Sequence, residues 1–149
     1  MSAVRRLDAW IGKRIMHPPI IWVCQRAGVT QFAVFRFLWW IVGLQSLLMS
    51  NPTHVLWRTF CIVFAIATTV SAAVWPDRPV KADRGGLRAW LWAWLLLDLL
   101  CCIALRKWSW GLTNLALALL AEYAATIVTI PPRKSEQMAR RLKLARLGA

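Results

Sequence analysis

Three ionisable side chains, Arg36, Asp98 and Glu122, lie inside long apolar stretches of this sequence. An ionisable group at the centre of a bilayer costs about 2.5–3.5 kcal/mol or more, so it normally faces other protein and has a partner. Counting about 1.5 Å per residue from one side places Arg36 about 7 Å deep, Glu122 about 12 Å and Asp98 about 15 Å. Because an arginine side chain can reach deeper than its backbone, we expect these residues to form one intramembrane charge cluster.

Two interpretations of this cluster are possible. In the first, Arg36 pairs with one carboxylate, the other carboxyl group is protonated, and the cluster sets the register of the helices. In the second, Asp98 and Glu122 bind and release protons or cations along a path through the membrane. The first is favoured because the remaining helix faces are almost wholly apolar and provide no route for water. Glu122 is the expected partner of Arg36, since Ala121 and Ala125 permit a neighbouring helix to approach closely.

Other residues with chemical potential are not arranged for catalysis. His17 and His54 are expected on opposite sides of the membrane, and the four cysteines form no CxxC pair. The sequence also contains no GxSxG, Walker or dinucleotide-binding pattern. We therefore expect a protein that is not an enzyme and that holds neither a metal nor a cofactor.

Four apolar segments have the length needed to cross a bilayer: 32–49, 55–74, 89–105 and 112–130. A helix needs about 20 residues to cross about 30 Å of hydrocarbon, and the lower limit lies near 17. Apolar residues make up 59% of the 149 residues and charged residues 17%, against about 45–50% and about 25% in soluble domains. The sequence therefore predicts an all-α integral membrane protein with a transmembrane domain of four helices at 31–130.

Positive charges predict the orientation of these helices. Short loops rich in Lys and Arg remain in the cytoplasm, so we expect both termini and the middle loop there. The opposite side has only Arg106 and Lys107. Topology thus accounts for the net charge of +13, and we expect no nucleic-acid partner. The cations on the cytoplasmic side are Arg5, Arg6, Lys13, Arg14, Arg26, Arg78, Lys81, Arg84, Arg88, Arg133, Lys134, Arg140, Arg141, Lys143 and Arg146.

The segment 1–30 is predicted to be amphipathic and to lie on the membrane surface. At 100° per residue, Trp10 belongs to an apolar face, and Arg5, Arg6 and Lys13 belong to the opposite face. Such a helix lies among lipid headgroups with its cations toward anionic lipid. These four residues are the predicted membrane-surface residues.

Two further boundaries follow from prolines. The sequence His17-Pro18-Pro19 is expected to stop the first interfacial helix, and residues 20–26 are expected to form a second short one. Pro131-Pro132 is expected to end the fourth membrane segment, which leaves 131–149 as a short basic cytoplasmic tail.

Small residues indicate where helices can pack closely. Ala67 and Ser71 are four residues apart in the second membrane segment, and Ala121 and Ala125 are four apart in the fourth. Small side chains at this spacing let two backbones approach. We therefore predict helix contacts at these four residues.

Almost no sequence remains outside the membrane segments, so any partner must be met within the bilayer or at its surface. We expect a non-enzymatic function through helix–helix contacts, as an accessory or assembly subunit of a membrane complex or as a homo-oligomer. One alternative is a small proton- or cation-coupled transporter or channel that uses Asp98 and Glu122. Another is an oligomeric effector that permeabilises membranes. The expected partners are the bilayer, anionic lipids of the cytoplasmic face, and other membrane proteins or a second copy, in a bacterial inner (plasma) membrane.

Overall fold

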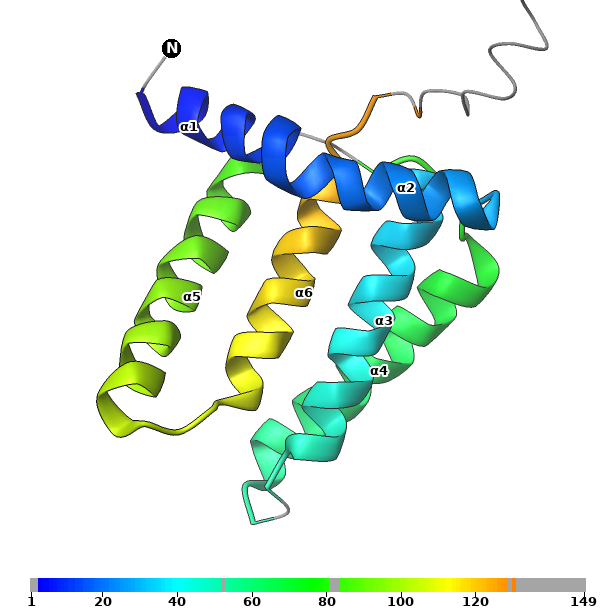
Figure 1. Ribbon diagram of the computed structural model, residues 1–149. Coiled ribbons are helices and arrows are strands. Elements are labelled where there is room, and N and C mark those ends of the chain that lie inside the picture. Colours follow the sequence, from blue (N-terminus) through cyan, green and yellow to red (C-terminus); the bar gives the residue numbers. More distant parts are fainter. Residues whose placement is uncertain (1–2, 52, 81–83, 129, 131–149) are drawn as a thin grey trace, which may run out of the picture.

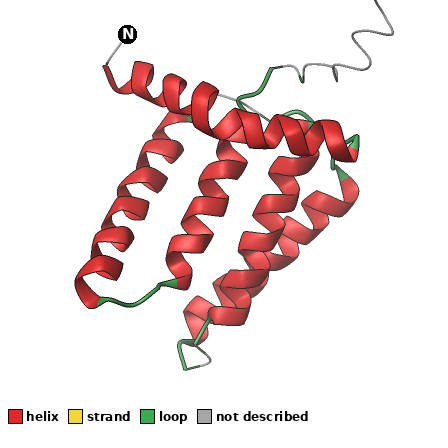
Figure 2. Ribbon diagram, viewed as in Figure 1, coloured by secondary structure: helices red, strands yellow, loops and turns green. Residues whose placement is uncertain are grey.

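Helices are the regular elements of the computed structural model, which describes residues 3–51, 53–80, 84–128 and 130 (Figure 1). Figure 2 shows the same elements joined by short loops. In chain order they are α1 (Ala3–Ile11), the π-helix η1 (Gly12–Met16), α2 (His17–Ala27), α3 (Gln31–Met49), α4 (Val55–Val74), α5 (Gly85–Leu105) and α6 (Trp110–Ala124).

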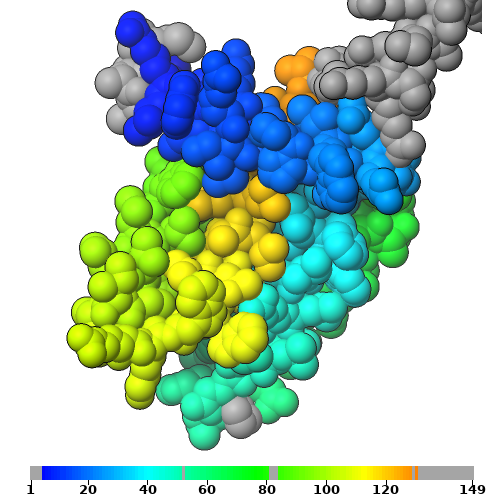
Figure 3. Space-filling model, viewed as in Figure 1, coloured from blue at the N-terminus to red at the C-terminus, as the bar shows by residue number. Residues whose placement is uncertain are grey.

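The helices form a bundle with a cover over one end. Helix α6 lies between α5 and α3 and packs on both, and α4 packs on α3. The continuous segment α1–η1–α2 lies across the end where α6 finishes, and the connection between α4 and α5 lies at that same end (Figure 1). Figure 3 shows this segment covering the end of the bundle. The α3–α4 and α5–α6 connections lie at the opposite end.

Three of the described helices, α3, α4 and α5, are long and apolar enough to cross a membrane. Their bounds agree closely with the first three predicted segments, although α5 begins four residues earlier than expected. The fourth predicted segment, 112–130, is shorter as a helix. Helix α6 has 15 residues, about 22 Å, which is less than the roughly 30 Å of a hydrocarbon core.

Helix α6 ends early because its last turn tightens. The backbone N–H of Thr126 donates to the Tyr123 carbonyl and that of Ile127 donates to the Ala124 carbonyl, so both bonds span three residues instead of four. The Thr126 hydroxyl donates to the same Tyr123 carbonyl at 2.7 Å. The helix therefore ends well before Pro131, where the sequence predicted its end, and residues 131–149 of the predicted tail lie outside the described residues.

The predicted stop at His17-Pro18-Pro19 is wrong, because the chain stays helical from Ala3 to Ala27. The prolines lie in the first turn of α2, where the fixed φ of proline is compatible with helical backbone. Immediately before them, η1 supplies a wider turn in which the His17 N–H donates to the Gly12 carbonyl.

The continuous segment α1–η1–α2, which we call the cover segment, has a buried row of residues and an exposed surface. Ile20 and Cys24 of α2 are almost fully buried against the bundle. The four predicted membrane-surface residues, Arg5, Arg6, Trp10 and Lys13, are all exposed.

Close packing of α3 on α4 occurs at Gly43. A Cβ atom at Gly43 would lie 2.6 Å from Thr68 Oγ1 and 3.3 Å from Ala65 Cα, so the two helices meet where one has no side chain. Of the four predicted packing residues, Ala121 and Ala125 are buried and Ser71 is half-buried, whereas Ala67 is exposed. The packed face of α4 lies at Cys61 and Ala65 instead of Ala67.

We predict that Gly43→Ala destabilises the protein. The added methyl group must displace Thr68 or separate the helices, which typically costs about 1–3 kcal/mol. The measurement is the thermal unfolding midpoint in mild detergent, followed by circular dichroism. Gly86→Ala is the matched control, because a Cβ there meets nothing within 4 Å. A midpoint for Gly43→Ala equal to that of the control would show that the α3–α4 contact is looser than described.

Candidate functional site

The C-terminal end of α6 carries two adjacent buried polar side chains, Glu122 and Tyr123. Glu122 is 0% exposed and Tyr123 is 1% exposed. Successive residues of a helix point about 100° apart, so these two side chains contact different neighbours. Buried polar groups require hydrogen-bond partners, and the partners come from elements far apart in the sequence.

Glu122 is held by one cation and one indole. Its Oε1 accepts a hydrogen bond from Arg84 Nη1 at 2.9 Å and another from Trp39 Nε1 at 3.1 Å. The Arg84 guanidinium also lies 5.9 Å from the centre of the Phe35 ring. Because Arg84 precedes α5 and Trp39 belongs to α3, this carboxylate joins three parts of the bundle.

Tyr123 is held by α1 and α5. Its hydroxyl donates to Asp8 Oδ1 at 2.6 Å and accepts from Trp92 Nε1 at 3.0 Å. Arg88 binds the same Asp8 carboxylate through Nε and Nη2, with the Nη2–Oδ2 distance 2.9 Å. The Arg88 guanidinium also lies 5.6 Å from the centre of the Tyr123 ring. A two-point arginine–carboxylate contact of this kind fixes orientation as well as distance.

Two more hydrogen bonds complete the attachment of this end of α6. His17 Nε2 lies 2.9 Å from Thr126 Oγ1, and Gln31 Nε2 donates to the Ile127 carbonyl at 3.1 Å. Since the Thr126 hydroxyl proton is directed at the Tyr123 carbonyl, we assign the Nε2–H tautomer to His17, with Nε2 as the donor. The cover segment, α3 and the start of α5 thus all bond to the last residues of α6.

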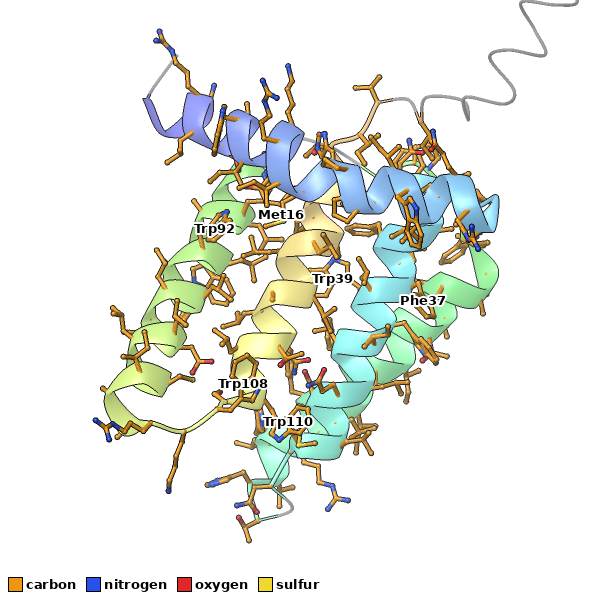
Figure 4. All side chains as sticks on the ribbon, in the orientation of Figure 1. Met16, Phe37, Trp39, Trp92, Trp108 and Trp110 are labelled. Atoms are coloured by element: carbon orange, nitrogen blue, oxygen red, sulfur yellow. The ribbon has the colours of Figure 1, made fainter. Side chains whose placement is uncertain are left out.

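Figure 4 shows how the indoles are distributed around this helix. Trp92 of α5 and Trp39 of α3 lie on either side of α6, toward the end that the cover segment crosses. Trp108 and Trp110 lie at the opposite end. The first two therefore serve as hydrogen-bond donors inside the bundle, and the last two lie where the α5–α6 connection turns.

The expected pairing of Arg36 with Glu122 or Asp98 is wrong. Arg36 Nε donates to Ser71 Oγ at 3.2 Å. Its Nη1 donates to the carbonyl oxygens of Pro76 and Arg78, the latter at 2.8 Å. The loop that follows α4 folds back over the end of the bundle and presents these two carbonyls. No residue pattern in the sequence signals that fold.

Asp98 and Glu122 also lie at different depths. Helix α5 begins at Gly85 and α6 ends at Ala124, so Asp98 is about 20 Å along α5 and Glu122 only about 3 Å from the end of α6. Asp98 Oδ2 instead lies 3.2 Å from a Cβ position at Gly111, in the first turn of α6. The positive end of that helix dipole favours a carboxylate there. Asp98 therefore lies apart from the other two residues of the predicted cluster, and Arg36 bonds to neither carboxylate in the described structure.

A small cavity of about 200 Å³ lies between the cover segment, α5 and α6, and its lining includes Asp8, Lys13, His17 and Arg88. Burial lowers the pKa of His17 below its usual value, and repulsion from Lys13 lowers it further. Burial by itself would raise the pKa of Asp8, but the hydrogen bonds from Arg88 and Tyr123 and the charge of Arg88 outweigh it, so that pKa is lowered. The cavity therefore favours a neutral imidazole beside an ionised carboxylate.

Within the described part of the chain, no three His, Cys, Asp or Glu residues are grouped closely enough to hold a metal ion. Comparison of the chain with protein families, with curated proteins and with solved structures found no match. The geometry alone therefore supports any function that we propose.

The sequence analysis missed most of the polar network at the end of α6. In the sequence, Arg84 and Arg88 contribute only to the cytoplasmic cations that predict the topology, and no role was predicted for Asp8 or Tyr123. A usable signal existed for two of them. Asp8 is an acidic residue in an otherwise basic segment, and Tyr123 is the one tyrosine of the chain. A carboxylate in a basic segment has cations nearby with which it can pair, and a tyrosine in an apolar helix needs a hydrogen-bond partner for its hydroxyl group.

We predict energetic coupling between Arg84 and Glu122. Arg84→Leu leaves a buried carboxylate without its cation and should lower the free energy of unfolding by about 1–3 kcal/mol, a range reduced by the partial exposure of Arg84. Adding Glu122→Gln removes the stranded charge and should restore most of that loss. Chemical denaturation of the four proteins in detergent measures the cycle.

The control for this cycle is Arg36→Leu combined with Glu122→Gln. Because Arg36 bonds to Ser71 and to loop carbonyls, this pair should show no coupling. Additive effects for Arg84 and Glu122 together with strong coupling for Arg36 would restore the pairing that the sequence suggested.

We also predict that acid weakens the attachment of the cover segment. The pKa of His17 is lower folded than unfolded, so its stabilising contribution is complete above its unfolded pKa, about 6.5, and is lost as the pH falls below that value. The thermal midpoint should fall between pH 7.5 and pH 5, and His17→Gln should flatten this part of the profile. His54→Gln, at an exposed residue of the opposite end, should leave the profile unchanged. An unaltered slope in His17→Gln would assign the pH dependence to another group.

Proposed function

We propose that this protein acts non-enzymatically in a membrane, as an accessory or assembly subunit or as a homo-oligomer, through contacts of its outer helices. The main neighbour of α5 is α6 and that of α4 is α3. Both outer helices are long and apolar, and only 17% of the α5 span and 11% of the α4 span are buried. Large apolar side chains on both, such as Leu56 and Leu100, are therefore free to contact lipid or another membrane helix.

A line of small residues on α5 is the observation that carries this proposal. Gly85, Ala89 and Ala93 follow each other at intervals of four residues, so they lie along one side of the helix. Ala89 and Ala93 are exposed. Small residues at this spacing are typical of surfaces where two membrane helices approach closely.

A groove runs beside this small-residue line. It has a volume of about 740 Å³ and is lined by α1 residues, including Leu7 and Ile11, and by α5 residues, including Ala89 and Ala93. Its walls are mainly apolar, and α1 covers its end nearest the predicted cytoplasmic side. A helix of a second protein or of a second copy can enter such a groove from the bilayer and pack on the small residues.

The separation of the two carboxylates favours assembly over transport. Glu122 is neutralised by Arg84, whereas Asp98 lies about 16 Å further along the bundle axis. A proton or cation path that uses both residues would need polar groups between them, and α6 carries mainly Leu and Ala there. The proposal places the covered end of the bundle in the cytoplasm of a bacterial cell, as the distribution of cations predicts.

We predict that Ala89→Leu and Ala93→Leu each weaken assembly. A larger side chain prevents close helix approach, and we expect dissociation constants about tenfold higher or more, which corresponds to about 1.4 kcal/mol. The measurement is the molar mass of the purified protein in mild detergent over a range of concentrations, by light scattering. Both residues are exposed, so unfolding midpoints should not change.

The matched control is Ala73→Leu, which enlarges an exposed alanine on α4 and should leave the molar mass unchanged. A wild-type protein that is monomeric at every concentration, both in detergent and after crosslinking in native membranes, would rule out the homo-oligomer. Loss of a co-purifying membrane subunit from Ala89→Leu but not from Ala73→Leu would identify the accessory role.

A further inference from the structure

A second groove lies between α3, α4 and the start of α5, on different residues from the groove beside α1. Its volume is about 310 Å³, and its lining includes Arg36, Trp39, Phe64, Ser71 and Arg84. We call it the Arg36–Arg84 groove. It combines two guanidinium groups with an apolar wall on helices that are long enough to cross a membrane.

Arg36 is an unusual buried cation. Its exposed fraction is 7%, yet among the described residues its recorded hydrogen bonds all go to neutral oxygens, those of Ser71, Pro76 and Arg78. Asp77 belongs to the same loop, but its Oδ1 accepts from Thr30 at 2.6 Å, and within the described part of the chain it forms no ion pair with Arg36. Buried charges are normally paired with an opposite charge, so this guanidinium favours an anion that the groove can admit.

The second arginine of the groove, Arg84, already has its own counter-ion. Arg84 is already paired with Glu122, and its side chain is 39% exposed. Glu122 balances Arg84, and the charges of Asp77 and Arg78, which also act on Arg36, have opposite signs, so Arg36 leaves one net positive charge at the groove. One monovalent anion therefore balances the groove.

The apolar wall and the depth of the groove identify the class of anion. Trp39 and Phe64 line the groove and pack edge to face, with ring centres 5.9 Å apart. Arg36 lies about 7 Å from the start of α3, which is the depth at which headgroups meet acyl chains when a helix begins at the membrane surface. If the phosphate of a lipid lies at Arg36, the acyl chain of that lipid would thus lie along Trp39 and Phe64.

We propose that the Arg36–Arg84 groove binds an anionic phospholipid of the leaflet on which α1 and α2 lie. The phosphate lies against Arg36, with Arg84 at its outer side, and Ser71 can donate its hydroxyl proton to a phosphate oxygen. The beginning of one acyl chain fills the apolar part of the groove, and the rest of the lipid remains in the bilayer. The lipid completes the charge balance of α3 and holds the start of α5 near α4.

The test counts lipids bound to the full-length protein. The protein in non-ionic detergent is titrated with phosphatidylglycerol or with phosphatidylcholine, and bound lipid is measured by native mass spectrometry. We expect one phosphatidylglycerol to bind about tenfold more tightly than phosphatidylcholine, because both phosphates can accept a hydrogen bond from Arg36 but the choline ammonium cancels the charge of its lipid and is repelled by the two arginines. Equal affinity for the two lipids would overturn the proposal.

Two variants separate the groove from general attraction to a basic surface. Arg36→Gln removes the buried charge, and Ala67→Phe fills the groove from an exposed position that lines it. Each should reduce phosphatidylglycerol affinity to the level of phosphatidylcholine. Arg14→Gln, which removes an exposed charge from the cover segment, and Ala73→Phe, which enlarges an exposed residue outside the groove, should retain wild-type affinity.

Each further outcome decides the proposal. If Arg36→Gln fails to fold, Ala67→Phe alone gives the answer, because it leaves every charge in place. Wild-type affinity in a folded Ala67→Phe protein would place the lipid elsewhere. Complete displacement of phosphatidylglycerol by millimolar inorganic phosphate would show that the groove recognises a free anion instead of a lipid.

Discussion

Burial of the Glu122 carboxylate beside Tyr123, at the end of the central helix, constrains the arrangement of the rest of the protein. A fully buried carboxylate needs a cation and hydrogen-bond donors, and an adjacent buried phenol needs its own partners. Arg84 and Trp39 both bond to Oε1 of the carboxylate, whose buried Oε2 has no hydrogen-bond partner among the described residues, and Asp8 and Trp92 bond to the phenol. Because these partners belong to α1, α3, α5 and the connection before α5, one short stretch of α6 determines how four parts of the chain meet.

The polar contacts concentrate at one end of the bundle, and this makes the two ends physically different. At the covered end, the described ion pairs and most long-range side-chain hydrogen bonds join separate elements. At the opposite end, the only long-range side-chain bond recorded among the described residues is that from Asn114 to Ser46, at 3.3 Å. Helix packing there depends on apolar contact and on close approaches such as Gly43 against α4. Hydrogen bonds and packing together therefore fix the covered end, whereas packing is the main contribution at the opposite end.

The lengths of the apolar segments predicted the bounds of α3 and α4 well. The segments at 32–49 and 55–74 agree with α3 and α4 to within a residue, because about twenty consecutive apolar residues can satisfy their backbone only as a helix in a bilayer. The bounds of α5 and α6 were less predictable. Residues 85–88, which include two glycines and Arg88, form the first turn of α5, although the apolar segment begins only at Ala89. A tightened last turn ends α6 before the apolar sequence ends.

The charge network was not predictable from depth counting. The predicted depths were counted from the ends of the segments 89–105 and 112–130, but α5 begins at Gly85 and α6 ends at Ala124. Asp98 therefore lies deeper than predicted and Glu122 lies less deep. Partners such as Asp8 lie more than a hundred residues from Tyr123 in the sequence, and only the folded path of the cover segment brings them together. Arg36 illustrates the same limit, since two of its three acceptors are backbone carbonyls, which have no sequence signature.

The π-helical turn Gly12–Met16 corrects the rotation of the buried row around the axis of the cover segment. A step of four residues turns an α-helix by about 400°, so a row at that spacing drifts by about 40° per step and by about 160° from Asp8 to Cys24. One wider turn contains an extra residue and returns the row by about 100°. Asp8, Gly12, Ile20 and Cys24 can therefore all face the bundle along a single rod. The cover segment is therefore a straight helical rod, and the single π-helical turn near its middle keeps its buried row on the side that faces the bundle.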